Sequence, residues 1–151
     1  MSNVTMDQLY LLANLAGTRI AVDTSEVEAV VRVSDISPVP GMGAHIAGLA
    51  ALRSRVLTII DVEALIHGRP MTAERRSLVI IANISGHSYG FLVDGVSDIC
   101  RVPEGELPLR GQFDFAWAPH ARAIVEHDGQ SWLLVSLAGF IESGAITAQA
   151  A

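Results

Sequence analysis

The chain has 151 residues, 50% of them hydrophobic, and a formal net charge of −6. That length fits one ordinary domain or two very small ones that share a core. An acidic chain without a basic stripe is not expected to bind nucleic acid, and no apolar run approaches the ~18 residues of a membrane-spanning helix. The single cysteine, Cys100, excludes an internal disulfide. Since residues 1–7 also lack the pattern of a secretory signal, we expect a cytoplasmic protein without direct membrane insertion.

Short apolar runs, rich in β-branched residues and separated by turns that contain glycine, predict about ten strands and few helices. The first part of the chain predicts strands over 9–15, 19–23 and 28–33, a loop over 34–43, a hairpin of strands 49–52 and 56–60, and a short helix over 62–66. After a boundary at 67–73, we expect strands over 78–84, 88–93 and 96–102, an aperiodic stretch over 103–119, a second hairpin within 123–135 and a short C-terminal helix over 137–142. This succession is typical of β-barrels or of a β-sandwich.

Two stretches of the chain occur twice in the same order. The hairpin and helix of 48–66 correspond to 123–141, a shift of 75 residues that aligns the turns and the helix caps. Ahead of each unit, Ala-Asn-Leu-Ala-Gly (13–17) corresponds to Ala-Asn-Ile-Ser-Gly (82–86), a shift of 69 residues. Two such matches in one order indicate a duplicated supersecondary plan.

The duplication favours two small barrels over one sandwich. We expect a single domain over 1–151, with a first barrel at about 16–67 and a second at about 76–136, and we leave open whether strand 9–15 is shared between them. Neither barrel is large enough to bury a sufficient core alone, so an apolar seam between the two is expected.

Residue types that serve catalysis or metal binding are present, but without the required spacing. Asp61 and Asp94 each follow an apolar strand, and we expect a helix cap and a turn residue rather than an acid–base pair. Cys100 is expected to be a small buried hydrophobic residue. The five histidines lack the spacing of metal ligands and are expected in solvated loops; they are His45, His67, His87, His120 and His127. No cofactor or metal is therefore expected.

Three questions stay open from the residues alone. Arg53, at a hairpin turn between apolar runs, is either solvated or a donor of directed hydrogen bonds to a carboxylate or to backbone carbonyls. The alternating aromatic residues Phe113, Phe115 and Trp117 either plug the end of the second barrel or form a partner-binding patch. A binding module without catalysis competes with an enzyme or small-ligand binder that uses an aspartate or a histidine in a pocket between the barrels.

Four stretches of the sequence resemble those of the CheW-like chemotaxis coupling proteins. They are Leu-Ala-Gly-Thr-Arg-Ile-Ala-Val-Asp (15–23), Pro-Val-Pro-Gly (38–41), Gly-Leu-Ala-Ala-Leu-Arg-Ser-Arg-Val-Leu-Thr-Ile-Ile-Asp-Val (48–62) and Gly-Phe-Leu-Val-Asp-Gly-Val-Ser-Asp-Ile (90–99). The resemblance extends from Leu9 to about Ile141. It implies a mainly β fold of two SH3-like five-stranded β-barrels that share a hydrophobic core, with short helices.

The resemblance also implies a function, that of a non-enzymatic adaptor in chemotaxis signal transduction. Such proteins link the cytoplasmic tips of chemoreceptors to the regulatory domain of a CheA-type histidine kinase, in arrays at the inner membrane that can include other CheW-like proteins. The alternative is an adaptor of a pilus-type or other non-flagellar chemosensory pathway. Carried over by motif, Val27, Arg53, Val96 and Ile99 fall near the groove that takes the receptor tip, whereas the kinase-facing residues are not identified.

The chain departs from the family pattern at two places near that groove. The family's Asn-Leu-Arg-Gly stretch is Ala51-Leu52-Arg53-Ser54 here. The family also tends to place a glutamate two residues after the position of Val27, where it can pair with the arginine, and this chain has Ala29 there and Glu28 one place earlier. A one-residue shift in a strand points a side chain to the opposite face. The resemblance therefore leaves two alternatives open: Arg53 keeps an ion pair of the family's kind, or it is free for a receptor carboxylate.

Overall fold

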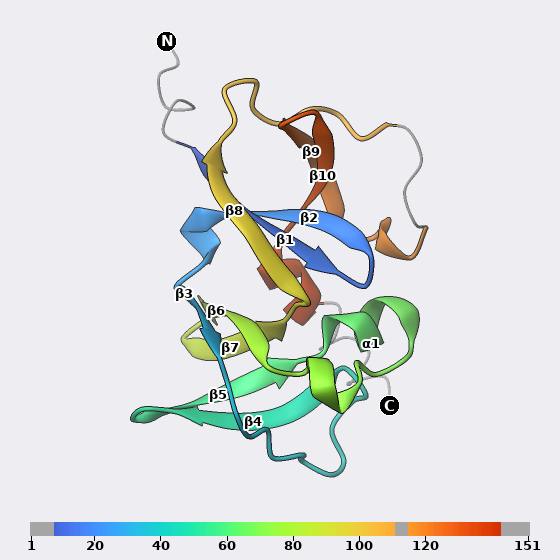
Figure 1. Cartoon of the computed structure of the whole chain (residues 1–151). Helices are drawn as coiled ribbons and strands as arrows, with labels where there is room; N and C mark the ends of the chain where they lie inside the picture. The colour runs from blue at the N-terminus through green and yellow to red at the C-terminus, as the bar shows by residue number, and fades with distance from the viewer. Residues whose placement is uncertain (1–7, 111–114, 143–151) are drawn as a thin grey trace.

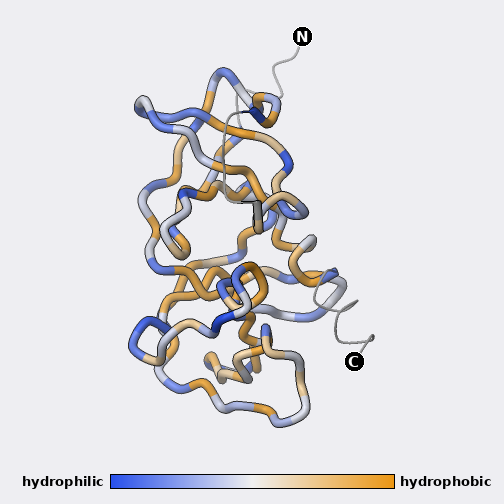
Figure 2. Tube along the Cα trace, turned by 90° about the vertical axis from the view of Figure 1, so that its right-hand side faces the viewer, coloured by the Kyte–Doolittle hydropathy of each residue, from blue (hydrophilic) through white to orange (hydrophobic). Residues whose placement is uncertain are grey.

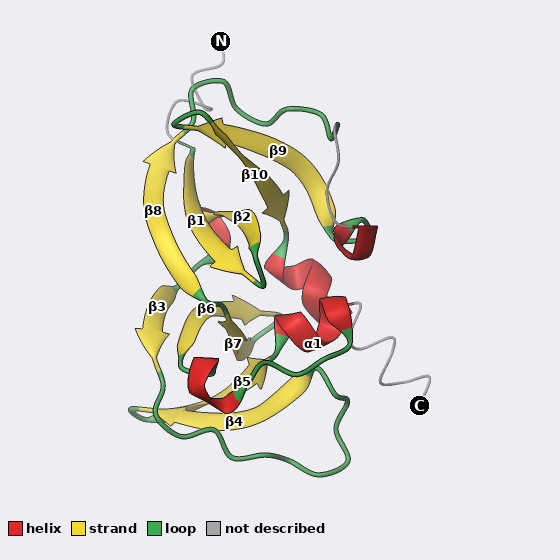
Figure 3. Cartoon of the chain, turned by 45° about the vertical axis from the view of Figure 1, so that its right-hand side comes forward, coloured by secondary structure: helices red, strands yellow, loops and turns green. Residues whose placement is uncertain are grey.

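The computed structural model describes residues 8–110 and 115–142, which form two five-stranded β-sheets, each curled into a small barrel (Figure 1). The strands are β1 (Leu9–Leu15), β2 (Thr18–Asp23), β3 (Ala29–Arg32), β4 (Ile46–Leu52), β5 (Arg55–Ile60), β6 (Leu78–Ile84), β7 (His87–Leu92), β8 (Gly95–Arg101), β9 (Ala121–His127) and β10 (Gln130–Val135). The helical segments are α1 (Val62–His67), residues 137–142, and the single 3-10 turns η2 (Thr24–Glu26), η3 (Ala73–Arg75) and η4 (Phe115–Trp117). The predicted mainly β fold with short helices is confirmed (Figure 3).

The pairing of the strands follows one plan twice. Sheet A has the order β8-β1-β2-β10-β9, and sheet B has the order β3-β6-β7-β5-β4. A shift of five strands along the chain converts the first order into the second. The corresponding pairs β2 with β10 and β5 with β7 are both parallel. The duplicated plan predicted from the sequence is therefore present in the fold.

The division of the chain between the two barrels differs from the predicted 16–67 and 76–136. Sheet B takes the continuous run from β3 to β7, whereas sheet A combines β1 and β2 with β8, β9 and β10. The third strand of each repeat pairs with the first strand of the other repeat, β3 with β6 and β8 with β1. The predicted partition is wrong because the apolar pattern locates strands but does not select their hydrogen-bonded neighbours. Strand β1 belongs to sheet A alone.

The four hairpin turns show the repeat in their backbone conformation. Each turn has a non-glycine residue in the left-handed region, namely Ala16, Arg53, Ser85 and Asp128, with φ of 52°, 57°, 53° and 56°. Ala16 and Ser85 are related by the shift of 69, and Arg53 and Asp128 by the shift of 75. In three of these turns a glycine with positive φ comes next, and only after Arg53 does Ser54 replace it. Hairpin geometry is thus determined locally in both copies.

The core has two parts, because alternate residues of a strand face opposite sides of its sheet. Tyr10 and Leu12 of β1 point into the interior of barrel A, in a cluster that also contains Cys100, which is buried as predicted. Leu11 and Ala13 point the other way, into a larger cluster that joins sheet A to sheet B. This larger cluster is the predicted apolar seam, and Figure 2 shows the hydrophobic stretches gathered along the strands that build it.

The C-terminal helical residues 137–142 close one side of the seam. Leu137 and Phe140 are almost fully buried there, and Trp117 packs its ring against Phe140 at a centroid distance of 6.2 Å. Trp117 is 0% exposed, so it is a core residue and not part of a partner-binding patch. Phe113 lies outside the described residues, as does the side chain of Phe115.

Candidate functional site

Asp61 is a structural carboxylate rather than a reactive one. It is 0% exposed, and its Oδ1 accepts a hydrogen bond from the backbone N–H of Ala64 at 3.0 Å, which caps α1 as predicted. Its Oδ2 accepts from the N–H of Met71 at 2.8 Å and from Nη2 of Arg76 at 2.9 Å. With three donors and no exposed surface, this carboxylate is not available to a substrate.

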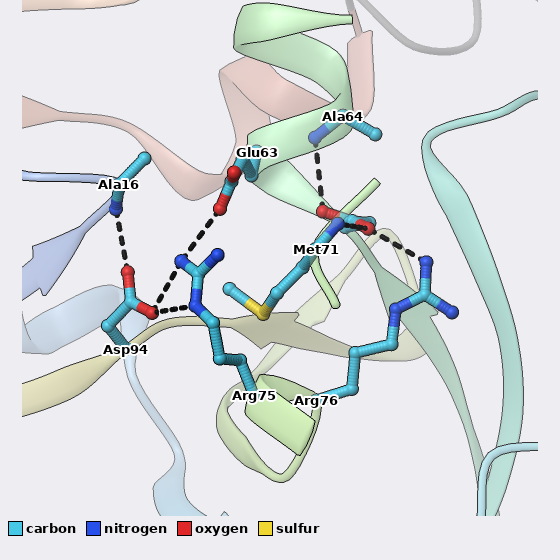
Figure 4. Close-up of polar contacts among 8 residues, drawn as sticks. Ala16, Glu63, Ala64, Met71, Arg75, Arg76 and Asp94 are labelled. Atoms are coloured by element: carbon cyan, nitrogen blue, oxygen red, sulfur yellow. Dashed lines mark hydrogen bonds and ion pairs between the residues drawn. The ribbon is translucent and has the colours of Figure 1, made fainter. Parts of the chain in front are cut away.

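Asp94 lies between β7 and β8, and its carboxylate also links the two barrels through hydrogen bonds, a role that the prediction of a turn residue did not include. Its Oδ2 accepts from the N–H of Ala16 in the β1–β2 turn at 2.7 Å, and its Oδ1 accepts from Nε of Arg75 at 2.7 Å. Arg75 reaches α1 at the same time, donating through Nη2 to Oε1 of Glu63 at 2.8 Å (Figure 4). The hydrogen bonds to Glu63 and Asp94 raise the pKa of Arg75. The network ties sheet A to the segment between α1 and β6.

The histidines and the cysteine form no metal site in the described part of the chain, where no group of three or more His, Cys, Asp and Glu residues is arranged to hold an ion. The expectation of solvated histidines is wrong for His45, which is 7% exposed, and for His120, whose ring lies 5.0 Å from that of Phe140. Burial lowers the pKa of both side chains. Burial, followed by the charge of Asp98, raises the pKa of Cys100, so its thiol stays protonated near neutral pH.

Val96 and Ile99 form an exposed apolar pair on β8, an edge strand of sheet A. They are 37% and 57% exposed. Three residues apart, they would face opposite sides of a regular strand, but an extra residue, Ser97, is inserted between the pairs Val96–Ala13 and Ile99–Leu11. Directly paired residues share a face of the sheet, and Leu11 and Ala13 both belong to the seam cluster. The bulge therefore places Val96 and Ile99 together on the side of sheet A that faces the seam. Unlike Leu11 and Ala13, the two side chains are exposed to solvent.

Val27 lies between η2 and β3, where the chain enters sheet B. It lines a hollow of about 460 Å³ at the seam, whose other walls are Ser25, Glu26, Glu28, Asn83, Ile84, Ser136 and Ala138. Glu26 fixes one wall, because its Oε1 accepts from the N–H of Leu137 at 2.8 Å and so holds the start of the C-terminal helical segment. Val27 is half-buried and packs against the seam cluster.

The repeat supplies a residue that sequence reasoning missed. The shift of 69 relates Val96 to Val27 and Ile99 to Val30. In β3, Val30 pairs with Ile80, as Ile99 of β8 pairs with Leu11. Val30 is half-buried and also packs against the seam cluster. We call Val27, Val30, Val96 and Ile99 the seam edge. Val96 and Ile99 lie on the edge strand β8, Val30 lies on the edge strand β3, and Val27 lies just before β3. The two edge strands are on the same side of the molecule in Figure 3. The offset of 69 was the signal that could have found Val30.

Arg53 lies apart from the seam edge, at the turn of the β4–β5 hairpin. It is exposed and lines a second hollow, of about 300 Å³, together with Ala29 and Glu28. No described residue makes a hydrogen bond or ion pair with its guanidinium. Glu28 instead pairs with Arg55, which also donates to Ser88 Oγ at 3.3 Å. Position 29 has no carboxylate, and the ion pair found beside Arg53 joins the neighbouring residues Glu28 and Arg55.

A sequence model of the CheW-like domain matches residues 9–145. The chain belongs to the CheW-like family. It is similar to the chemotaxis protein CheW of Thermotoga maritima, with 28% identity over 123 residues that cover 82% of this chain and 80% of the relative. It is also similar to the probable chemotaxis protein CheW of Rhizobium etli, with 27% identity over 139 residues that cover 87% and 85%.

The fold of this CheW-like chain also has a solved counterpart, the scaffolding protein TtCheW from Thermoanaerobacter tengcongensis. The two structures match with a TM-score of 0.72 and 21% sequence identity, over 86% of this chain and 89% of the other. The likeness supports the two-barrel fold. Within residues 8–110 and 115–142, no helix is long and apolar enough to cross a membrane.

Of the four site residues predicted for the CheW-like groove, the fold relates three to one another. Val96 and Ile99 share one face of β8, and Val27 occupies the corresponding place before β3. Arg53 belongs to a separate hollow, although Glu28 lines both hollows and separates them. A docking surface that used all four would extend from the seam edge past Glu28 to the tip of the β4–β5 hairpin.

Proposed function

We propose that the chain is a non-enzymatic chemotaxis adaptor that couples the cytoplasmic tip of a chemoreceptor to a CheA-type histidine kinase. The observation that carries the proposal is the exposed apolar seam edge in a chain of the CheW-like family. An apolar pair such as Val96 and Ile99, exposed on an edge strand, indicates a protein-binding surface when it is contiguous with further apolar residues. The relatives named above are chemotaxis proteins, and one structural counterpart is a scaffold.

The receptor tip would dock on the seam edge. Val27, Val96 and Ile99 supply apolar contacts, and Arg53 supplies a directed polar contact to an acidic residue of the receptor. A few residues at the well-packed, desolvated centre of an interface contribute most of the binding free energy, whereas charges at the rim contribute more to specificity and to the rate of association.

A second apolar surface is available for the regulatory domain of the kinase. On the outer side of the β4–β5 hairpin, Leu49 and Val56 are 39% and 59% exposed. The shift of 75 relates Val56 to Ser131 in the β9–β10 hairpin of barrel A, so the same position is polar in the other copy. The same shift relates Leu49 to Ile124, which is half-buried and bridged to Leu107, so neither corresponding position of barrel A is an exposed apolar residue. An apolar pair that is exposed in one copy only is expected to have a partner at that copy.

In this proposal the chain works in the cytoplasm, within receptor arrays at the inner membrane, and assembles with other CheW-like proteins there. A pilus-type or other non-flagellar chemosensory pathway would use the same two surfaces with a different receptor and kinase. No described residue favours the competing enzyme or small-ligand hypothesis, since Asp61 and Asp94 both accept hydrogen bonds from neighbouring groups.

The test is reconstitution from purified parts. The chain, a chemoreceptor tip hairpin and the CheA-type kinase from the same organism are mixed and sedimented, and kinase autophosphorylation is measured. We expect a ternary assembly that forms only when the chain is present. Ile99 is 57% exposed in the free chain, so about half of its side chain remains to be buried when the receptor tip docks. Ile99→Ser removes this contribution to binding and should lower receptor-tip affinity about tenfold. Leu109→Ser is the matched control, since Leu109 is also exposed, at 38%, but outside the seam edge.

Absence of any assembly with receptor or kinase would overturn the proposal. Equal losses for Ile99→Ser and Leu109→Ser would show that the seam edge is not the docking surface. A ligand screen by thermal shift, with metal analysis of the purified chain, addresses the enzymatic alternative; a stoichiometric metal or a large shift with one metabolite would favour it.

A further inference from the structure

The hollow beside Arg53 has an apolar floor and a charged rim. Its walls are Glu28, Ala29, Val31, Leu52, Arg53, Ser54, Arg55 and Ile81. Ala29 and Val31 of β3 are two residues apart and face the same side, and Ala29 pairs directly with Ile81 of β6. The floor is therefore made of short or branched aliphatic side chains, whereas the polar side chains stand around it.

The charges at the rim do not cancel. Arg55 is paired with Glu28 and donates to Ser88, so its charge is compensated within the chain. Arg53 has no such partner among the described residues, although it lines the same hollow. One uncompensated positive charge thus stands at the edge of an apolar depression.

The backbone fixes where that charge is presented. Arg53 has a φ of 57°, in the left-handed region, at the tip of the β4–β5 hairpin. An arginine in this conformation is unfavourable by roughly 1 kcal/mol relative to a glycine or an asparagine. The hairpin nevertheless presents arginine where the other three turns have alanine, serine and aspartate.

We propose that this hollow binds one glutamate side chain of the docking partner. The aliphatic stem of the glutamate packs on Ala29, Val31 and Leu52, which are partly exposed, and its carboxylate accepts hydrogen bonds from the guanidinium of Arg53. Arginine suits this role because its planar guanidinium can donate two parallel hydrogen bonds to a carboxylate. The ion-paired side chains of Glu28 and Arg55 form the adjoining wall of the hollow. The inference rests on the proposed function, because it assigns a chemical feature to the partner that docks there.

A double-mutant cycle tests the inference. The probe is the chemoreceptor tip hairpin of the reconstitution, in versions that each replace one exposed glutamate by glutamine. Their affinities are measured by calorimetry against the unmodified chain and against Arg53→Asn. Asparagine removes the charge and adopts the left-handed turn readily, so the fold is kept. At one glutamate position, we expect the glutamine version of the tip to bind the unmodified chain about tenfold more weakly than the original tip does. Against Arg53→Asn, the glutamine version should bind no more weakly than the original tip.

A second variant tests the hollow itself. In Ala29→Glu the new carboxylate is placed in the hollow with Arg53, so it should occupy the site and lower tip affinity about tenfold while thermal stability is maintained. Arg69→Ala is the matched control, since Arg69 is also exposed and stands two residues after the end of α1. In Figure 1, α1 lies on the side of barrel B opposite the β4–β5 turn. Arg69→Ala should leave the affinity unchanged.

The outcomes separate this inference from the proposed function. If the unmodified chain binds no receptor tip, both are overturned. If the tip binds but no glutamate position is coupled to Arg53, the docking function stands and the glutamate site is wrong. The glutamate site is also wrong if Arg69→Ala lowers affinity as much as Arg53→Asn, because the effect would then be one of net charge.

Discussion

The carboxylate of Asp61 offers a quantitative test of how the first copy of the repeat is stabilised. In Asp61→Ala, the N–H of Ala64 loses its cap, which costs about 1 kcal/mol. The N–H of Met71, a residue 2% exposed, is left without an acceptor at about 1–3 kcal/mol. The side chain of Arg76 is 26% exposed, so we discount its lost ion pair to about 1 kcal/mol. The expected loss of unfolding free energy is therefore about 3–5 kcal/mol.

The second copy of the repeat supplies the matched variants. Ser136 stands at the position of Asp61 and caps residues 137–142 through a hydrogen bond from Gly139 N–H to its Oγ, 3.3 Å long. Asp61→Ser keeps a capping oxygen but removes the acceptors of Met71 and Arg76, so it should cost about 1 kcal/mol less than Asp61→Ala. Ser136→Ala should cost only about 1 kcal/mol, since it removes a cap and no buried ion pair.

Equilibrium urea denaturation, followed by the fluorescence of the buried Trp117 and Trp132, measures these differences. If Asp61→Ala costs no more than Ser136→Ala, the contacts to Met71 and Arg76 contribute nothing to stability. If Asp61→Ser is as costly as Asp61→Ala, the capping contribution is misassigned. Either result would refute the reasoning.

Three further predictions concern the backbone and two histidines, the buried His45 and the half-buried His120. Arg53→Asn should raise the free energy of unfolding by about 0.5–1 kcal/mol through relief of left-handed strain, and a decrease in the thermal midpoint would contradict this. Gly48→Ala should destabilise by about 3 kcal/mol, because Gly48 has a φ of 147° and an added Cβ would lie 2.2 Å from the carbonyl oxygen of Ser37; a loss below about 1 kcal/mol in urea would speak against it. Burial lowers the pKa of His45 and His120 from 6.5, so the unfolded chain binds more protons and stability should fall as pH decreases below about 6.5. The double variant His45→Gln, His120→Gln should flatten that pH profile, and an unchanged profile would assign it to other groups.

The strands, turns and caps were predictable because each depends on residues a few positions apart. The alternation of apolar residues located the strands, and glycine after a left-handed residue marked three of the four hairpin turns. Asp61 and Ser136 were expected at the starts of helical segments, where both accept N–H groups three residues ahead. The repeat followed from the same local signals occurring twice.

The candidate site was predicted less completely, because its parts meet through strand pairing. Val96 and Ile99 share a face only because Ser97 is an extra residue in β8, and a bulge has no signature in the apolar pattern. Val30 joins the seam edge through its pairing with Ile80 in another repeat. The hydrogen bonds by which Asp94 links Ala16 to Arg75 also depend on the chain crossing from one sheet to the other after β7.

The amino-acid sequence by itself determined the local elements, their duplication and the lack of catalytic spacing, since these follow from backbone preference and side-chain periodicity. Only the tertiary structure decided which strands became neighbours, and hence that barrel B is continuous while barrel A is assembled from both ends of the described chain. It also decided that Glu28 pairs with Arg55 and leaves Arg53 without a partner among the described residues. The backbone N–H and C=O groups along one strand are nearly the same as those along another, so they do not select a partner strand. The partner is selected by burial of apolar side chains in the shared seam, which involves residues far apart in the chain.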